Sequence, residues 1–250
     1  MINFLKERYD NAMIFSTEIT YSVPCLKDNI SALGVKLHGA VMGLIPGGFA
    51  DELHKNSVQP FSMYCLYDEK SEKAIVRVYA LSDKARIINN ALSDTDEIKI
   101  YGIFSPIKKI NSVSREIDIN EEADKIKDKV RLNILTPAIY RSGGRSFCTP
   151  ELTRFFRSTA EKFTLFTGEG DTDYLCGLIS KIHLTDYSLS GKSYNISGNI
   201  YNGMTGFVDI PITKKDADKE FFKKLLVFSQ YSGIGAKTAM GMGGVRIEII

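Results

Sequence analysis

The first half of the chain alternates apolar and polar residues in a pattern that predicts the element order β-α-β-β-α-β. Residues 11–23 carry the β-branched and aromatic side chains of a strand. Residues 31–45 have a helical spacing of apolar side chains, at Leu33, Leu37, Val41 and Leu44. The other predicted elements are a helical turn at 49–55, strands at 59–68 and 73–81, a helix at 83–92 and a strand at 97–107. This is the order of a ferredoxin-like domain, and we expect the charged residues 107–129 to extend its last strand and then form a linker.

The second half of the chain repeats the order of elements without repeating the letters. A strand is predicted at 130–140, and the segment TPELTRFFRSTAEKF (149–163) opens with a helix N-cap signal. The remaining predicted elements are long strands at 175–191 and 192–210, a helix at 214–231 and a last strand at 244–250. We therefore expect an α+β protein of two tandem ferredoxin-like (RRM-like) domains, over residues 1–128 and 129–250.

A glycine-rich loop lies between the last predicted helix and the last strand. Within about a dozen residues it holds Gly233, Gly235, Gly241, Gly243 and Gly244, although glycine makes up 20 of 250 residues overall. Glycine reaches positive φ readily, and successive amide N–H groups in such a loop can form an anion-binding nest. Lys237 and Thr238 would add a positive charge and a hydroxyl. A phosphate-bearing ligand fits this chemistry, and a tight helix-to-strand connection is the alternative explanation.

Two common nucleotide-binding motifs can be excluded for this loop. A Walker loop needs glycine directly before the lysine, but Ala236 precedes Lys237. A dinucleotide fingerprint needs a third glycine where the chain has Thr238. Both motifs also run from strand to loop to helix, whereas the predicted order here is helix, loop, strand.

Composition and charge narrow the class of protein without selecting a partner. The chain is 44% hydrophobic and 25% charged with a net charge of +2, values that are ordinary for a soluble domain. The four cysteines, Cys25, Cys65, Cys148 and Cys176, form no C-x-x-C pair, which argues against a zinc ribbon. No apolar run approaches the roughly 20 residues that cross a bilayer, and the first residues lack a signal-peptide pattern. We expect a reduced, cytoplasmic protein with no membrane partner.

Three segments together resemble a known family. The segment YSGIGAKTAMGMGGVRI (231–247) resembles the C-terminal glycine-rich signature of the CRISPR-associated endoribonucleases that cut repeat RNA into guide RNAs. These enzymes belong to the repeat-associated mysterious protein (RAMP) superfamily. The segment from residue 135 to 158, with its RSGGR turn, and the histidine-containing segment from 49 to 67 are similar to two further motifs of the family, in the same order.

The resemblance implies a fold, an activity and a set of partners. It implies two ferredoxin-like domains, in agreement with the element order, with the catalytic histidine in the first domain and the glycine-rich loop in the second. It implies cleavage without a metal or other cofactor, by attack of a ribose 2′-OH that leaves a 2′,3′-cyclic phosphate and a 5′-OH. CRISPR repeat RNA is the implied partner, and association with other CRISPR-associated effector subunits or as a homodimer stays open.

The resemblance also selects catalytic candidates among the three histidines. His54 falls where the family has its catalytic histidine, and we favour it as general base while leaving the role of acid open. His38 lies on the preceding helix and is the second catalytic candidate, with a partly buried residue of no chemical role as the alternative. His183 is expected on a strand surface. Where the family often has a tyrosine and a lysine, the chain has Met42 and Gln59; Lys55, Lys36 or Lys237 could take over.

The candidates for RNA binding are basic residues and loop glycines. Arginine matches phosphate groups in shape and charge and stacks on bases. The candidates are Lys237, Gly233, Gly235, Gly241, Gly243, Arg141, Arg145 and Arg157, with Arg154 beside them. A solvated charged turn is the alternative explanation for the arginines. Two rival functions stay open at this point: a non-catalytic RAMP subunit that binds guide RNA in an effector complex, and a small-molecule phosphate binder.

Overall fold

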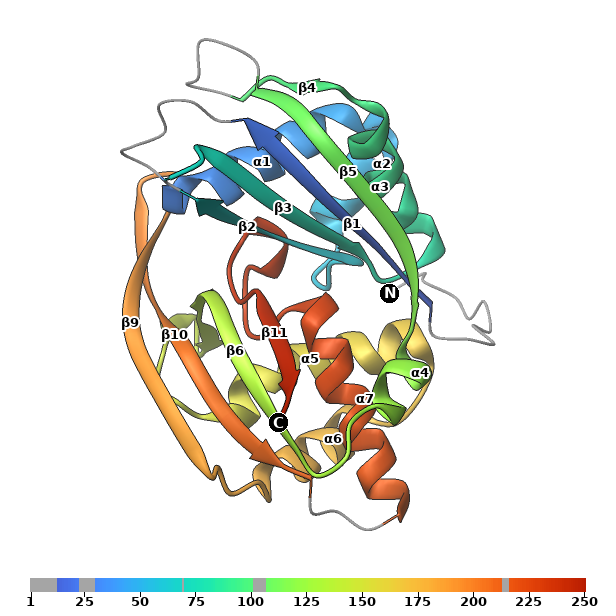
Figure 1. The fold of residues 1–250 in the computed structure, drawn as a ribbon, viewed down its shortest axis with the longest axis vertical. Coiled ribbons are helices and arrows are strands. Elements are labelled where there is room, and N and C mark those ends of the chain that lie inside the picture. Colours follow the sequence, from blue (N-terminus) through green and yellow to red (C-terminus); the bar gives the residue numbers. More distant parts are fainter. Residues whose placement is uncertain (1–12, 23–29, 69, 101–106, 213–215) are drawn as a thin grey trace.

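A computed structural model describes residues 13–22, 30–68, 70–100, 107–212 and 216–250. Two antiparallel sheets, each covered by helices, lie one above the other in Figure 1. The first sheet is built from residues before position 119 and the second from residues after position 128. Among the described residues, no helix is long and apolar enough to cross a membrane.

The first sheet has the strand order β2-β3-β1-β5-β4. Its strands are β1 (Met13–Ser22), β2 (Phe61–Asp68), β3 (Lys73–Ala80), β4 (Glu97–Ile98) and β5 (Ile107–Asp118). The helices of this half are α1 (Ile30–Leu44), α2 (Gly47–Lys55), the short 3₁₀ helix η1 (Asp83–Ala85), α3 (Arg86–Asp94) and α4 (Ile119–Asp124). Strand β1 lies between its antiparallel partners β3 and β5, as the ferredoxin-like topology requires.

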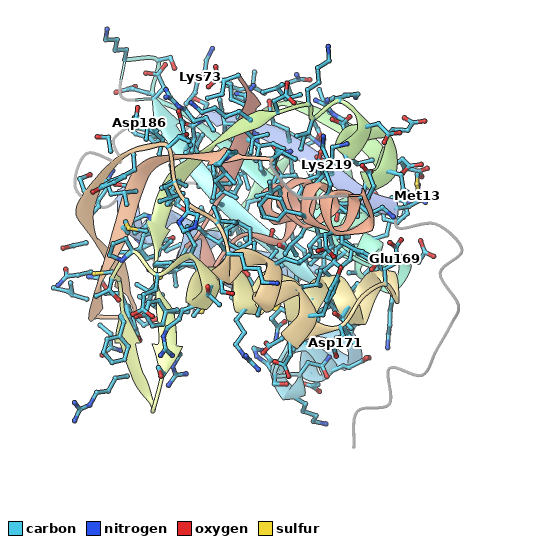
Figure 2. The ribbon with its side chains drawn as sticks, turned by 90° about the horizontal axis from the view of Figure 1, so that it is seen from below. Met13, Lys73, Glu169, Asp171, Asp186 and Lys219 are labelled. Atoms are coloured by element: carbon cyan, nitrogen blue, oxygen red, sulfur yellow. The ribbon has the colours of Figure 1, made fainter. Side chains whose placement is uncertain are left out.

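The second sheet repeats this topology with the order β11-β6-β10-β9. Its strands are β6 (Lys129–Ala138), β9 (Asp186–Ile196), β10 (Asn199–Pro211) and β11 (Val245–Ile249), and a separate hairpin is formed by β7 (Tyr140–Ser142) and β8 (Arg145–Phe147). Its helices are α5 (Leu152–Thr167), α6 (Thr172–Ser180), α7 (Asp216–Ser232) and the 3₁₀ helix η2 (Thr238–Met240). In Figure 2 the β7–β8 hairpin projects away from the sheets, on the side opposite the α5–α6 loop that carries Glu169 and Asp171.

The helical spacing seen in the sequence becomes the buried face of α1. Leu33, Leu37 and Val41 are each about one turn apart and each 1% exposed, and they pack on the first sheet. The other face of that sheet carries Tyr64 and Tyr79, which belong to the same apolar cluster as the core of the second half. The two halves are therefore joined by a shared apolar core. A binding site can form where the two halves meet at the edge of this core.

The backbone of the glycine-rich loop lies close to the backbone of α1 in the other half. A Cβ atom on Gly34 of α1 would lie 3.0 Å from the Cα atom of Gly241, and it would overlap the hydroxyl of Tyr194. The same hydroxyl donates to the carbonyl of Met240 at 3.0 Å. Gly241 has a φ of 96°, which a residue with a side chain rarely adopts. Glycine at these two positions lets α1 approach the loop without a gap.

Three details of the predicted elements are wrong. Residues 175–180, expected in a strand, belong to helix α6, whose start is capped by the Asp171 carboxylate accepting from two backbone N–H groups. The turn between the two long strands falls at Ser197 and Gly198, not at residues 191–192. Residues 119–124 form α4 in place of a linker, because Asp118 caps this helix. Residues 101–106 of the predicted strand 97–107 lie outside the described part, which holds β4 and the first residue of β5.

Candidate active site

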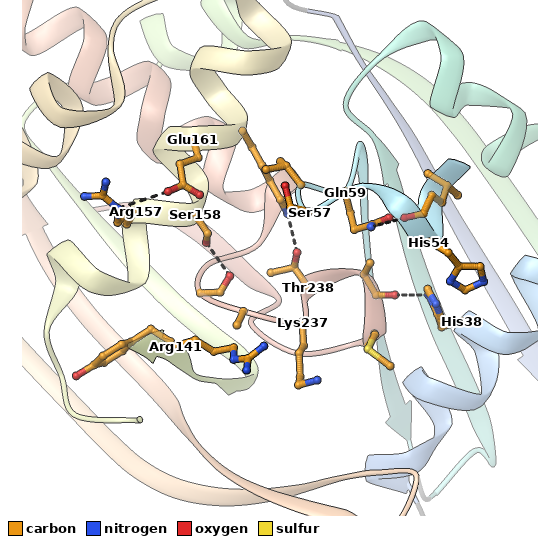
Figure 3. Close-up of a pocket in the computed structure, with 18 of the residues that line it drawn as sticks. His38, His54, Ser57, Gln59, Arg141, Arg157, Ser158, Glu161, Lys237 and Thr238 are labelled. Carbon is orange, nitrogen blue, oxygen red and sulfur yellow. Dashed lines mark hydrogen bonds and ion pairs between the residues drawn. The ribbon is translucent and has the colours of Figure 1, made fainter. Parts of the chain in front are cut away.

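A pocket of about 730 Å³ lies where the two halves meet. Helices α1 and α2 line it from the first half, and β7, α5 and the glycine-rich loop line it from the second (Figure 3). The predicted residues that it brings together are His38, His54, Arg141, Arg154, Arg157, Gly235 and Lys237. Gly233, Gly241, Gly243 and Arg145 are not among the lining residues, and neither is His183. His183 is exposed in the connection between α6 and β9, so its expected place on a strand is wrong.

His38 is held in one orientation by a contact with the second half of the chain. Its Nδ1 atom lies 2.9 Å from the carbonyl oxygen of Ala239, and its ring stacks on Phe61 at 6.0 Å between ring centres. A carbonyl only accepts, so Nδ1 carries the hydrogen and Nε2 keeps its lone pair in the neutral ring. Partial burial lowers the pKa of His38; the hydrogen bond to Ala239 opposes this, and the nearby charge of His54 adds to it. The arrangement favours a neutral imidazole with a free Nε2.

His54 presents a different environment to the same pocket. It is exposed in the last turn of α2, where the helix dipole favours positive charge. The Gln59 amide donates to the carbonyls of Leu53 at 2.8 Å and Asn56 at 3.0 Å, and so fixes the end of this helix. Met42 and Gln59, which replace the tyrosine and lysine of the related family, both line the pocket. Gln59 therefore supports the helix that carries His54, and its amide N–H groups are already engaged.

The glycines of the loop are required by the folding of the loop itself. Three of them donate their amide N–H groups to protein carbonyls: Gly233 to Ser229 at 2.9 Å, Gly235 to Phe155 at 2.8 Å and Gly243 to Pro137 at 3.0 Å. A Cβ on Gly235 would overlap the carbonyl oxygen of Ile139, and one on Gly243 would overlap that of Ile234. These three amides are therefore not free to hold an anion, and within the loop Lys237 is the cation that faces the pocket.

Helix α5 holds the loop through donors on consecutive turns. Ser158 donates to the carbonyl of Gly235 at 2.6 Å, and Thr159 donates to that of Gly233 at 2.9 Å. Lys162, one turn further, is only 5% exposed and lines the pocket floor. Burial lowers the pKa of Lys162 to about 7. Sequence reasoning missed this lysine, because nothing in the pattern of the helix distinguishes it from a solvated one.

The arginines around the pocket differ in their partners. Arg157 lies 3.4 Å from Glu161 and 3.5 Å from Asp173, and Arg154 donates to Glu151 at 2.8 Å. Glu161 is the one carboxylate among the lining residues of the described chain, against several basic side chains, so the pocket is cationic. Arg141 on β7 is exposed at its edge, and the Nζ atom of Lys237 lies 4.8 Å from the ring centre of Tyr201. Such a surface suits a polyanion that presents phosphates.

Comparison with known proteins finds similarity to CRISPR-associated endoribonucleases. A model of the CRISPR-associated endoribonuclease Cas6 family matches residues 132–245. The CRISPR-associated endoribonuclease Cas6 of Mycobacterium tuberculosis is 24% identical over 241 residues, which span 90% of this chain and 74% of that protein. The Cas6 endoribonuclease of Streptococcus thermophilus is 24% identical over 236 residues, spanning 86% of this chain and 91% of that protein. A solved Cas6 product complex matches 95% of this chain and 100% of its own at a TM-score of 0.78 and 17% identity. The expected tandem ferredoxin-like fold is thereby confirmed.

Proposed function

We propose that the chain is a member of the Cas6 family of CRISPR-associated endoribonucleases, that it processes CRISPR repeat RNA, and that it cuts this substrate as follows. The cut is metal-independent: a ribose 2′-OH attacks the neighbouring phosphate and leaves a 2′,3′-cyclic phosphate and a 5′-OH. The observation that carries this proposal is the presence of two histidines from consecutive helices at one cationic pocket. An imidazole pair is sufficient for this reaction, because the nucleophile belongs to the RNA.

We assign the two histidines opposite roles. His38 is the general base, because burial disfavours its charged form and the contact with Ala239 leaves Nε2 as the acceptor. His54 is the general acid, because it lies exposed at a helix C-terminus that favours a cation. The nearby charge of His54 is a further cause that lowers the pKa of His38. The sequence alone had favoured His54 as the base, and the environment of His38 is the reason for the change.

The proposed step balances with these two groups alone. Nε2 of His38 takes the 2′-OH proton while the 2′ oxygen forms its bond to phosphorus. The bond from phosphorus to the 5′ oxygen breaks, and His54 gives its proton to that oxygen. His38 ends protonated and His54 neutral, and exchange with water restores both. Arg141 and Lys237 stabilise the negative charge that builds on the phosphate, a task that suits fixed cations at the pocket edge.

The predicted RNA contacts extend the site beyond the pocket. We propose that Arg145 on the exposed β7–β8 hairpin and Arg157 on α5 bind flanking phosphates, while Gly233, Gly241 and Gly243 shape the loop that presents Gly235 and Lys237. We also propose the domain boundary at residues 128 and 129, since the second sheet begins with β6 at Lys129. Binding of further effector subunits or of a second copy stays a prediction.

One experiment tests the reaction directly. Purified protein is incubated in EDTA with a CRISPR repeat RNA and with the same RNA carrying one 2′-deoxy sugar at the cut. We expect cleavage of the first RNA only, with a 2′,3′-cyclic phosphate that mass spectrometry identifies by the loss of one water relative to the 3′-phosphate. Cleavage of the deoxy substrate, or dependence on added metal, would refute the mechanism. Tight binding of both RNAs without cleavage would instead support a guide-RNA scaffold.

RNA affinity should fall steeply with salt, because phosphate contacts release counterions. If Arg141, Arg145, Arg157 and Lys237 each meet one phosphate, a single-stranded site should give a log–log slope of about −3 from these contacts. Filter binding of the 2′-deoxy RNA measures this slope without cleavage. Lys237→Ala should reduce the slope by about 0.7, whereas the control Lys219→Ala, on α7 outside the pocket lining, should leave it unchanged. A flat response would count against the assigned cations.

A further inference from the structure

Lys162 is a buried amine that the reaction, as proposed, does not use. It sits in the middle of α5 with 5% of its surface exposed, and its Nζ atom donates to the carbonyl of Ser232 at 2.9 Å and to the hydroxyl of Thr238 at 2.6 Å. No ion pair of Lys162 occurs among the described residues. Burying an ammonium group without a counter-ion costs free energy that an apolar residue on the same helix face would not. Because both of its hydrogen bonds go to the glycine-rich loop and its start, they indicate a role for Lys162 in holding that loop.

One of the two residues that Lys162 holds, Thr238, begins the loop segment next to His38. Thr238 begins η2, and the residue that follows it, Ala239, offers its carbonyl to Nδ1 of His38. This three-residue helix is bracketed by two residues in the left-handed region, Lys237 with φ 64° and Gly241 with φ 96°. The backbone N–H of Met240 donates to the carbonyl of Lys237 at 2.9 Å. This hydrogen bond lies within the loop and does not attach η2 to the rest of the fold. Two side chains outside the loop supply such an attachment: the Tyr194 hydroxyl donates to the Met240 carbonyl at 3.0 Å, and Lys162 donates to the Thr238 hydroxyl, next to Ala239, at 2.6 Å.

We propose that Lys162 is a positioning residue for His38: by anchoring Thr238 it fixes the Ala239 carbonyl that selects the tautomer of the histidine. The inference rests on the proposed role of His38 as the base. Without the anchor, η2 can shift, the ring can take the other tautomer, and the hydrogen then occupies the nitrogen that must accept the 2′-OH proton. A displacement of about 1 Å at a reacting group is enough to cost on the order of a hundredfold in rate.

The tautomer can be measured without RNA. ¹⁵N-labelled imidazole shifts distinguish the two nitrogens, and the chain has three histidines, so the His38 signals are identified by their loss in His38→Ala. In the wild type we expect mainly the form with hydrogen on Nδ1. Lys162→Met, which keeps the length of the side chain and removes the donor, should raise the other tautomer. It should also lower kcat about a hundredfold with little change in KM.

Matched variants separate positioning from general destabilisation. Thr238→Val removes the hydroxyl that Lys162 binds and should raise the other tautomer, as Lys162→Met does. Thr238→Ser keeps a hydroxyl at this position and should keep the wild-type tautomer. Thr159→Val removes a different hydrogen bond from the same helix to the same loop, outside the pocket lining, and should leave the tautomer unchanged. Thermal unfolding checks that each variant is folded. If Lys162→Met does not fold, Thr238→Val provides the same test.

Two outcomes are distinguishable. A folded Lys162→Met or Thr238→Val protein with the wild-type tautomer and wild-type kcat would overturn the positioning role. If these variants shift the tautomer while His38→Ala cleaves normally, the positioning inference holds and the assignment of His38 as base fails.

Discussion

Replacing His38 by alanine should lower the single-turnover cleavage rate by about 10²- to 10⁴-fold, the range that one general base contributes. The side chain is half-buried, stacked on Phe61 and bound to a backbone carbonyl, so no neighbouring group occupies the same place. Binding of the 2′-deoxy repeat RNA should change little, because a neutral ring adds no phosphate contact. Single-turnover kinetics at saturating protein, with binding measured separately, check both parts.

The pH dependence gives a second, independent reading of His38. Burial lowers the pKa of His38, so the ring stays neutral to a lower pH than an exposed histidine would. The cleavage rate should therefore fall only as the pH drops below the ordinary range of histidine, where the base becomes protonated. His183→Ala, an exposed histidine outside the pocket lining, is the control and should keep the wild-type profile. Normal cleavage by His38→Ala would remove His38 from the mechanism.

Replacing His54 by alanine should cost about 10²- to 10⁴-fold on natural RNA, and this loss should depend on the leaving group. A substrate with sulfur in place of the bridging 5′ oxygen departs as a thiolate, which needs no proton because thiols are far more acidic than alcohols. His54→Ala should therefore cut the 5′-thio RNA nearly as fast as the wild type does. His38→Ala should stay slow on both RNAs, since the attacking hydroxyl is unchanged.

The same variant also tests the coupling between the two rings. The charge of His54 is one of the causes that lower the pKa of His38. In His54→Ala that pKa should rise, and the acidic limb of the rate on 5′-thio RNA should move to higher pH. If instead the 5′-thio substrate rescues His38→Ala and not His54→Ala, the roles are reversed and His54 is the base.

Much of the fold followed from local patterns in the sequence. The apolar positions Leu33, Leu37 and Val41 predicted α1, and the β-branched and aromatic side chains of residues 11–23 predicted β1. The short apolar run at 175–180 was assigned to a strand, since such a run is also typical of a buried helix and periodicity cannot separate the two. The decisive signal was the N-cap Asp171, which lies just before the run.

The site was predictable only in part. His54 and His38, Lys237 and three of the arginines were identified from resemblance and residue chemistry, and all of them line one pocket. The hydrogen bond from His38 to Ala239 spans 201 residues, and no local pattern encodes such a contact. Lys162 looks like any charged residue of an amphipathic helix until its neighbours are known. The glycines suggested a phosphate nest, whereas the amides of Gly233, Gly235 and Gly243 are bound to protein carbonyls.

The long separation between His38 and Ala239 has a consequence during synthesis. A ribosome completes the helix that carries the imidazole long before it makes the carbonyl that orients it. A chain interrupted anywhere between the two positions would hold the ring with either nitrogen protonated and with no cationic loop opposite it. Prematurely terminated products should therefore be inert towards cellular RNA, and nuclease activity should arise only when the second half of the chain has docked on the first.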